Sequence, residues 1–401
     1  MVFIGAWLLV LLLLHSSAVA SPPQGPEPGS GTGSSSASAD ELALLSAKSA
    51  LSDPSGSTRL CTWRGVTCSR RHPGRNVALS INSLGLGGRV SPFLGNLSFL
   101  RTLDLGNNSL AGPIPPELGR LGRLRVLNLS VNSLEGGIPA ALGMCAQLTT
   151  LSLASNHLHT VRSLLSMIPN LQYLSLYSNN FWGDLLLIGN LTQLNYLYIG
   201  YNSFNGTVPT TLGNLKSLLE FDLSRNKLTG SIPANLLQIP SLSIELDLSH
   251  NLLEGPIPPE IGNLKSVSSF HAESNRLSGE IPSTLGECQL LQNLYLQNNF
   301  LRGTLPNSLI GLKNLEILDL SNNSFSGPIP KFLGNITTLI YLNISFNNFT
   351  GEVPTFGFFS NASAFSIHGN PKLCGGIFDL HLPPCSPELS KKKYLRMCGL
   401  V

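Results

Sequence analysis

The side chains best suited to hold another molecule lie between residues 173 and 273. Five of the chain's eight tyrosines fall in the first part of this stretch, and tyrosine combines a large contact area with a polar hydroxyl at low entropic cost. Carboxylates and histidines follow, and together they would favour a basic peptide and respond to pH near about 6.5. The predicted ligand-binding residues are Tyr173, Tyr177, Tyr196, Tyr198, Tyr201, Asp222, Asp247, His271 and Glu273.

Two groups carry this prediction, each with a structural alternative. The tyrosine cluster is the five tyrosines above, whose rings could simply cover the surface of a sheet. Asp104, Asp247 and Asp319 share a Leu-Asp-Leu pattern, and Asp222 has the related Phe-Asp-Leu; this common pattern predicts solvated residues. Imidazoles and carboxylates can also bind metal, but a flat sheet would spread them, so we expect neither a metal site nor a cofactor. The acidic strip comprises Glu220, Asp222, Glu245, Asp247, His250, His271 and Glu273.

The rest of the sequence offers no signature of catalysis or of polyanion binding. It contains no GxSxG, HExxH or P-loop pattern, so we expect no enzyme. The 25 basic and 22 acidic residues leave a net charge of +3. Nucleic acid is therefore not an expected partner, because phosphate binding needs clustered basic residues in excess.

A repeat in the sequence determines where these residues lie in the fold. From residue 77 to 354 the chain follows the template L-x-x-L-x-L-x-x-N-x-L-x-G-x-I-P, and its asparagines recur every 23 to 25 residues. A first copy with Leu84 in place of Asn brings the count to about twelve, and both period and pattern fit leucine-rich repeats. The repeat asparagines are Asn108, Asn132, Asn156, Asn179, Asn202, Asn226, Asn251, Asn275, Asn299, Asn323 and Asn347.

The template predicts an α/β solenoid with a parallel sheet. In L-x-L the leucines point inward and the intervening residues point outward, and each coil buries its leucines only against its neighbours. The asparagine amide is expected to bond backbone groups of adjacent coils. Gly-x-Ile-Pro is expected to form a tight bend.

The ends of the chain differ from the repeats. Residues 1–20 have the apolar run and the small-x-small pattern of a signal peptide, which implies export. Residues 21–39 form a Pro/Gly/Ser linker, 40–76 a cap that begins with a short helix, 355–386 a second cap and 387–401 a basic tail. No later stretch is long enough to span a membrane. In an oxidising compartment we expect disulfides Cys61–Cys68 and Cys374–Cys385, buried thiols at Cys145 and Cys288, and an unassigned Cys398.

The repeats and caps resemble a known family. The LxGxIPxxLGxL repeats, a front cap reading CTWRGVTC and a rear cap reading GNPKLCGGIFDLHLPPC resemble the ectodomains of plant leucine-rich-repeat receptor kinases. FHAESNRLSGEIP and LNISFNNFTGEVPTFGFFSNAS are most similar to the subfamily of immune receptors that sense bacterial proteins or peptides.

The resemblance implies a right-handed superhelix with a second short sheet formed by the Ile-Pro segments. It also implies a ligand on the inner or lateral surface and a co-receptor kinase near the carboxyl-terminal repeats. Three features depart from the family pattern: a shortened front cap, the loss of Gly-x-Ile-Pro after Asn156 and Asn179, and a chain that ends at SKKKYLRMCGLV, where a membrane helix and a kinase would follow. The sequence thus predicts a receptor truncated before its membrane helix.

Ten Asn-x-Ser/Thr sequons are predicted glycan acceptors in an exported chain. Glycans on Asn107, Asn128 or Asn343 would stand on the inner face and leave its middle free for a partner. The sequons are Asn96, Asn107, Asn128, Asn190, Asn205, Asn322, Asn335, Asn343, Asn348 and Asn361.

The favoured function is a secreted, receptor-like protein that binds a peptide or protein in plant immune perception, in the cell wall space or at the outer face of the membrane through a partner. One alternative is an inhibitor of a microbial wall hydrolase, similar to polygalacturonase-inhibiting proteins. Another is a degenerate, truncated receptor without binding activity.

Overall fold

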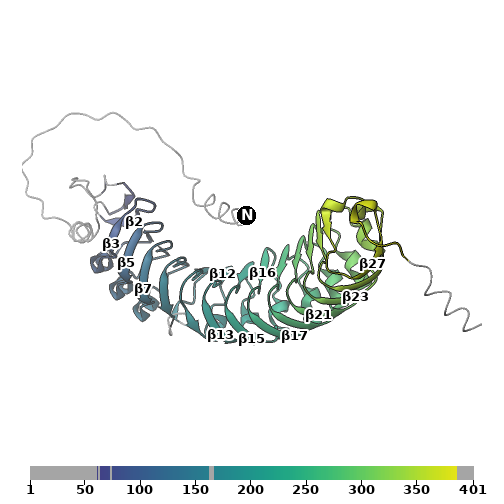
Figure 1. Ribbon diagram of the computed structural model, residues 1–401. Coiled ribbons are helices and arrows are strands. Elements are labelled where there is room, and N and C mark those ends of the chain that lie inside the picture. Colours follow the sequence, from purple (N-terminus) through teal and green to yellow (C-terminus); the bar gives the residue numbers. More distant parts are fainter. Residues whose placement is uncertain (1–60, 62–63, 73–74, 162–166, 386–401) are drawn as a thin grey trace, which may run out of the picture. The chain divides into compact units, whose positions relative to one another are not determined.

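The computed structural model describes residues 61, 64–72, 75–161 and 167–385, which all belong to one compact unit. The predicted signal peptide, linker, capping helix and basic tail, together with Cys398, lie outside the described residues. Within the described unit, successive repeats form coils stacked side by side (Figure 1). Each coil contributes one strand to a large sheet, and most add a short strand on a second side and a single 3-10 turn.

The large sheet has fourteen strands, and the twelve between β1 and β26 are the predicted repeats. They are parallel, whereas β1 is antiparallel to β2. The register places Leu103 beside Leu127 and Leu127 beside Leu151, all of them buried. The strands are β1 (Val66–Cys68), β2 (Asn76–Ser80), β4 (Thr102–Asp104), β6 (Val126–Asn128), β8 (Thr150–Ser152), β10 (Tyr173–Ser175), β12 (Tyr196–Tyr198), β14 (Glu220–Asp222), β16 (Glu245–Asp247), β18 (Ser269–His271), β20 (Asn293–Tyr295), β22 (Ile317–Asp319), β24 (Tyr341–Asn343) and β26 (Phe365–Ser366).

The second side carries two sheets where the family resemblance implied one. A four-stranded and a nine-stranded sheet are separated between β9 and β11, in the coils that lack Gly-x-Ile-Pro. In coils that carry Ile-Pro the strand ends before the isoleucine, so the Asn-to-Gly segment forms the strand and the expected Ile-Pro strands are wrong. The strands are β3 (Gly87–Arg89), β5 (Ser109–Pro113), β7 (Ser133–Gly137), β9 (His157–Thr160), β11 (Trp182–Gly183), β13 (Ser203–Thr207), β15 (Lys227–Gly230), β17 (Leu252–Gly255), β19 (Arg276–Gly279), β21 (Phe300–Gly303), β23 (Ser324–Gly327), β25 (Asn348–Val353) and β27 (Lys372–Gly375).

Short 3-10 turns, rather than α-helices, close the coils of the described chain. Leu118 of η3 is buried, and a Cβ on Gly119 would lie 2.2 Å from the Ala141 carbonyl oxygen, so close stacking requires glycine there. The turns are η2 (Pro92–Asn96), η3 (Pro116–Arg120), η4 (Ala140–Met144), η6 (Ile188–Asn190), η7 (Thr210–Asn214), η8 (Leu236–Gln238), η9 (Pro259–Asn263), η10 (Ser283–Glu287), η11 (Asn307–Gly311), η12 (Lys331–Asn335), η13 (Gly357–Ser360), η14 (Ala362–Ala364) and η15 (Phe378–Leu380).

The repeat asparagines form the predicted ladder, which we call the asparagine ladder. The Asn251 amide nitrogen donates to Leu223 O of the preceding coil (3.0 Å) and to Leu248 O (3.2 Å), and its oxygen accepts from Leu228 N (3.1 Å). The other repeat asparagines bond in the same way. The sequence analysis missed one member, Asn370 in the rear cap, which donates to Ile344 O (2.9 Å). The spacing Ile367-x-x-Asn370 is the signal that could have found it.

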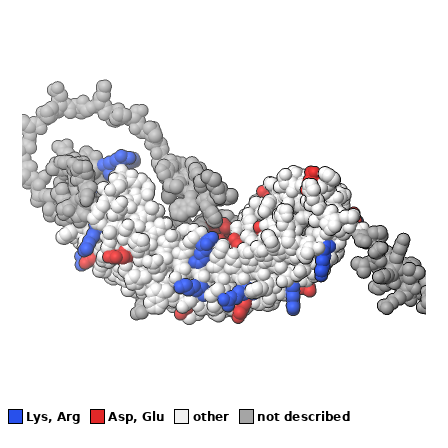
Figure 2. Space-filling view, in the orientation of Figure 1, with Lys and Arg blue, Asp and Glu red and all other residues white. Residues whose placement is uncertain are grey.

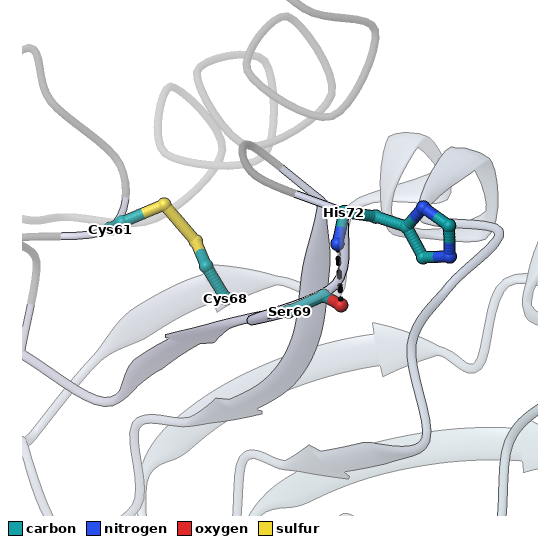
Figure 3. The surroundings of a disulfide bond; sticks show 4 residues. All are labelled: Cys61, Cys68, Ser69 and His72. Atoms are coloured by element: carbon teal, nitrogen blue, oxygen red, sulfur yellow. Dashed lines mark hydrogen bonds between the residues drawn. A yellow bond between two sulfur atoms is a disulfide. The ribbon is translucent and has the colours of Figure 1, made fainter.

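The cysteines follow the sequence predictions. Cys61 pairs with Cys68, and nearby the His72 backbone N–H donates to Ser69 Oγ at 3.1 Å (Figure 3). Cys374 pairs with Cys385. Cys145 and Cys288 are buried free thiols, and burial raises the pKa of Cys145 to about 11 and that of Cys288 to about 12. Both are therefore packing residues rather than reactive ones.

Candidate functional site

One position in each coil adopts a left-handed backbone without being glycine. It is the residue just before each of the eleven repeat asparagines and, in the first coil, Ser83 before Leu84; its φ lies between 50° and 58° in all twelve coils. Its N–H donates to the next coil; Tyr201 N, for example, donates to Ser224 O at 2.9 Å. Stacking therefore fixes a conformation that few side chains favour. Three such residues, Tyr201, Arg225 and His250, thereby lie side by side.

The structure brings the tyrosine cluster together on the outward side of β10 and β12. Tyr173 pairs with Tyr196 across the two strands. Ring centroids lie 5.6 Å apart for Tyr173 and Tyr198, and 5.0 Å apart for Tyr177 and Tyr201. The tyrosines are less exposed than predicted: only Tyr201 is exposed, at 39%, and the others are half-buried. The cluster is thus a packed platform rather than a set of free rings.

Burial changes the pKa values of these tyrosine hydroxyls. It raises the pKa of Tyr173 to about 12, with Glu220 adding to the effect. Burial also raises the pKa of Tyr177 and Tyr198, and carboxylates of β14, Asp222 for Tyr177 and Glu220 for Tyr198, push in the same direction. The hydroxyls therefore stay protonated and can donate hydrogen bonds.

The acidic strip continues directly from the tyrosine cluster. The register places Tyr198 beside Asp222, Asp222 beside Asp247, and Asp247 beside His271. Glu220 lies beside Glu245 in the parallel row. Red carboxylate atoms are visible on the upper side of the central coils in Figure 2.

The prediction that these four aspartates are solvated is wrong for Asp247, which is buried, whereas Asp104, Asp222 and Asp319 are half-buried. In each of the four, one carboxylate oxygen accepts the backbone N–H two residues later: Gly106 for Asp104, Ser224 for Asp222, Ser249 for Asp247 and Ser321 for Asp319, at 2.7 to 3.1 Å. These aspartates hold the turn that leads into the ladder. Asp247 is only 9% exposed.

Burial makes the carboxylates of the strip reluctant to ionise, and neighbouring like charges add to the effect at Asp222, Glu245 and Asp247. Burial raises the pKa of Asp222, and the neighbouring Asp247 raises it further. Burial likewise raises the pKa of Glu220 and Asp247, and that of Glu245 to about 7. A cation placed beside these groups would relieve both effects.

His271 lies between two carboxylates of the acidic strip, those of Glu245 and Glu273. Its Nε2 lies 3.4 Å from Glu245 Oε1 and its Nδ1 lies 3.8 Å from Glu273 Oε2. Burial would lower the pKa of His271, but the adjacent Glu273 and the other surrounding carboxylates outweigh it and raise the pKa. The expected spreading of these groups by a flat sheet is therefore wrong at His271. Among the described residues, nevertheless, no group of three or more His, Cys, Asp or Glu has a geometry that could hold a metal ion.

Two neighbours were missed by the sequence analysis. Tyr295 stacks on His271 with centroids 4.6 Å apart, and Arg225 lies over the Tyr201 ring, 4.8 Å from its centroid. Arg225 Nη2 also contacts His250 Nε2 at 3.3 Å, and burial together with this cation lowers the pKa of His250. The 24-residue period identifies both as neighbours of predicted residues; the ring contacts require coordinates.

Eight sequon asparagines are exposed, but Asn128 and Asn343 are half-buried. Each donates its amide N–H to an aspartate of the preceding coil, Asp104 at 2.8 Å and Asp319 at 3.1 Å. Glycosylation stays a prediction for all ten. Within the described ranges, no helix has the length and apolar content needed to cross a bilayer.

Comparison with known proteins identifies the repeats. Two leucine-rich-repeat family models match, one over residues 192–253 and the other over 99–121, 123–145, 244–264, 290–312, 314–336 and 338–358. The chain contains leucine-rich repeats. The leucine-rich-repeat chain is homologous to the ectodomains of plant leucine-rich-repeat receptor kinases.

Among the relatives of this leucine-rich-repeat protein is the receptor kinase-like protein Xa21 of Oryza sativa subsp. japonica, 52% identical over 82 residues. That match spans 17% of this chain and only 8% of the relative. The structure of the plant peptide hormone receptor RGFR1 in complex with RGF2 is similar, with a TM-score of 0.53, 30% identity, and coverage of 73% of this chain and 58% of that one. A plant ice-binding protein is also similar, with a TM-score of 0.58, 26% identity, and coverage of 87% and 98%.

Proposed function

We propose that this leucine-rich-repeat protein is an extracellular, receptor-like protein whose central inner face binds a peptide or protein with a basic residue. The central inner face is the tyrosine cluster together with the acidic strip. One observation carries the proposal: packed tyrosines and crowded carboxylates adjoin on five consecutive strands, β10 to β18. Homology to receptor ectodomains supports it, because a relative of this fold is described as a peptide hormone receptor.

The two halves of the face have complementary uses. Half-buried tyrosines lose little side-chain entropy on binding and offer protonated hydroxyls. The carboxylates lie near two histidines, His250 and His271, and burial together with neighbouring like charges raises the pKa of Asp222 and Glu245. An incoming lysine or arginine would gain charge-assisted hydrogen bonds there.

A role in plant immune perception is part of the proposal, since Xa21 and EFR, which are receptor kinases, match short segments at 52% and 49% identity. A co-receptor kinase is the proposed second partner. Exposed apolar residues in and beside β24 support a protein contact there: Ile340 (65%), Tyr341 (39%) and Phe346 (58%). The acidic strip disfavours the alternative of an inhibitor of enzymes that act on anionic pectin, because such an inhibitor would gain from a basic face.

The test is selection of binders from a library of short random peptides, with the purified protein as bait. We expect enrichment of peptides with Lys or Arg, and loss of their binding in the double variant Tyr196→Ala/Tyr198→Ala with little change in thermal unfolding. Tyr341→Ala is the matched control, because it stands in the same row as Tyr196 outside the cluster. Binders without basic residues, or unfolding of the double variant, would contradict the proposal.

A further inference from the structure

A polar hollow lies beside the tyrosine cluster, at the edge where the inner strands begin. Its volume is about 370 Å³, within the range of small-ligand sites. Four consecutive coils contribute to it, and its lining contains neither a carboxylate nor an apolar side chain among the described residues. The lining residues are Arg125, Gln147, Thr149, Asn170, Gln172 and Gln193.

Most of the hydrogen-bonding capacity of this lining is unused. Asn170 Nδ2 donates to Ala146 O (2.9 Å) and Thr149 Oγ1 donates to Arg125 O (3.1 Å). In the described part of the chain, the three glutamine amides and the Arg125 guanidinium form no side-chain hydrogen bond, and all four are exposed. Each amide can donate and accept in one plane, so the hollow offers alternating donors and acceptors.

Alternating donors and acceptors fit neighbouring hydroxyl groups, which also donate and accept. A hydroxyl-rich ligand is a saccharide, and Arg125, as the only charged lining residue, adds a fork suited to a carboxylate. An aromatic wall is close by, since Gln172 directly precedes Tyr173, and Tyr173 pairs with Tyr196. Arg101 occupies the same row as Arg125 one coil earlier, and the Arg125 backbone N–H donates to Arg101 O (2.8 Å). Positive charge therefore continues along this edge.

We propose that this hollow binds an oligosaccharide that carries a carboxylate on at least one sugar unit. The site is separate from the acidic strip, which would repel such a ligand. It does not depend on the peptide-binding function proposed above, and either can fail without the other. A peptide occupant would instead need apolar contacts, which the described lining does not provide.

The experiment is titration calorimetry of the purified protein at about 0.15 M salt, where exposed charges beyond about 8 Å are screened. The probes are a galacturonic acid hexamer and its carboxyl-reduced, neutral counterpart. We expect the acidic hexamer to bind about tenfold more tightly than the neutral one. The variant Arg125→Gln should remove this preference, whereas Gln147→Ala/Gln172→Ala/Gln193→Ala should abolish binding of both probes.

Two matched controls separate the site from general charge effects. Gln292→Ala removes an amide in the Thr149 row six coils later, and Arg302→Gln removes an exposed cation on the second sheet; neither should change binding. Equal affinity for both probes, equal effects of Arg125→Gln and Arg302→Gln, or no binding of the acidic hexamer would each overturn the proposal.

Discussion

The asparagine ladder and the central inner face are built on the same coils, yet their polar groups are in opposite states. Ladder asparagines are largely buried and bonded on both amide atoms to backbone of their own and the preceding coil. Carboxylates of the central inner face are crowded, and the pKa of Glu245 is raised to about 7 by burial. The ladder stabilises the fold, and its stability lets the neighbouring face hold groups that repel one another.

This difference shows which positions of a coil must keep one side chain and which can vary. Every ladder position must supply the same amide, because neighbouring coils present the same backbone groups. The position just before it has the same left-handed backbone in twelve coils, but its side chain ranges from Ser155 to Tyr201, Arg225 and Phe346. Stacking fixes the backbone there and leaves the side chain free to vary.

The largest effect is expected in the ladder. Asn251→Ala removes the partners of Leu223 O, Leu248 O, Ser249 O and Leu228 N, and should lower the free energy of unfolding by roughly 3 kcal/mol. Urea denaturation measures this loss. Asn298→Ala is the control, because its exposed amide bonds only to two side chains, Ser274 Oγ at 3.4 Å and Asn322 Nδ2 at 3.0 Å. Similar losses of unfolding free energy in both variants would contradict the prediction that a ladder asparagine contributes more to stability than a surface asparagine.

The second effect is a pH dependence that arises from the acidic strip. The folded pKa values of Glu220, Asp222, Glu245 and Asp247 are raised, so between about pH 4 and pH 7 the folded state binds more protons than the unfolded state. The raised pKa of His271 acts in the same direction. Stability should therefore fall as pH rises through this window, by on the order of 2 kcal/mol.

Chemical denaturation at a series of pH values measures this slope. Glu245→Gln should flatten it, whereas Glu135→Gln, an exposed residue on β7, should leave it unchanged. A protein whose stability rises from pH 5 to pH 7 would show that the strip is not strained.

A smaller gain is expected at the left-handed position. Val131 has φ of 54° although it is β-branched, which is an unfavourable combination. Val131→Gly should stabilise the fold by about 0.5–1 kcal/mol, and the opposite exchange, Asn322→Val, should destabilise it. Thermal unfolding of both variants checks the signs; a loss of stability in Val131→Gly would mean that stacking, not backbone strain, governs this position.

The smallest change in stability is expected for Tyr201→Ser, because serine occupies the same position in four other coils, as Ser83, Ser155, Ser178 and Ser274. The variant loses the ring contacts with Tyr177 and Arg225 and should cost only about 0.5 kcal/mol. Peptide binding should weaken by more than stability does. A stability loss as large as that of Asn251→Ala would place Tyr201 in the scaffold.

Several features of the site could be read from the sequence, and others could not. The period placed Asp222, Asp247 and His271 in one row, which the register confirms. Asp247, however, was mistaken for a solvated residue, because Leu-Asp-Leu contains no sign of the N–H that its carboxylate accepts. Burial of the tyrosines depends on how neighbouring rings pack, and periodicity carries no information about packing.

The sequence by itself determined the solenoid, its parallel sheet, the ladder and the two disulfides, because each depends on a short pattern repeated or placed locally in the chain. Tertiary structure alone decided the break between β9 and β11, the left-handed row, the convergence of Glu245 and Glu273 on His271, and the polar hollow. These features arise from contacts between side chains and backbone of different coils, whose distances depend on how closely the coils stack.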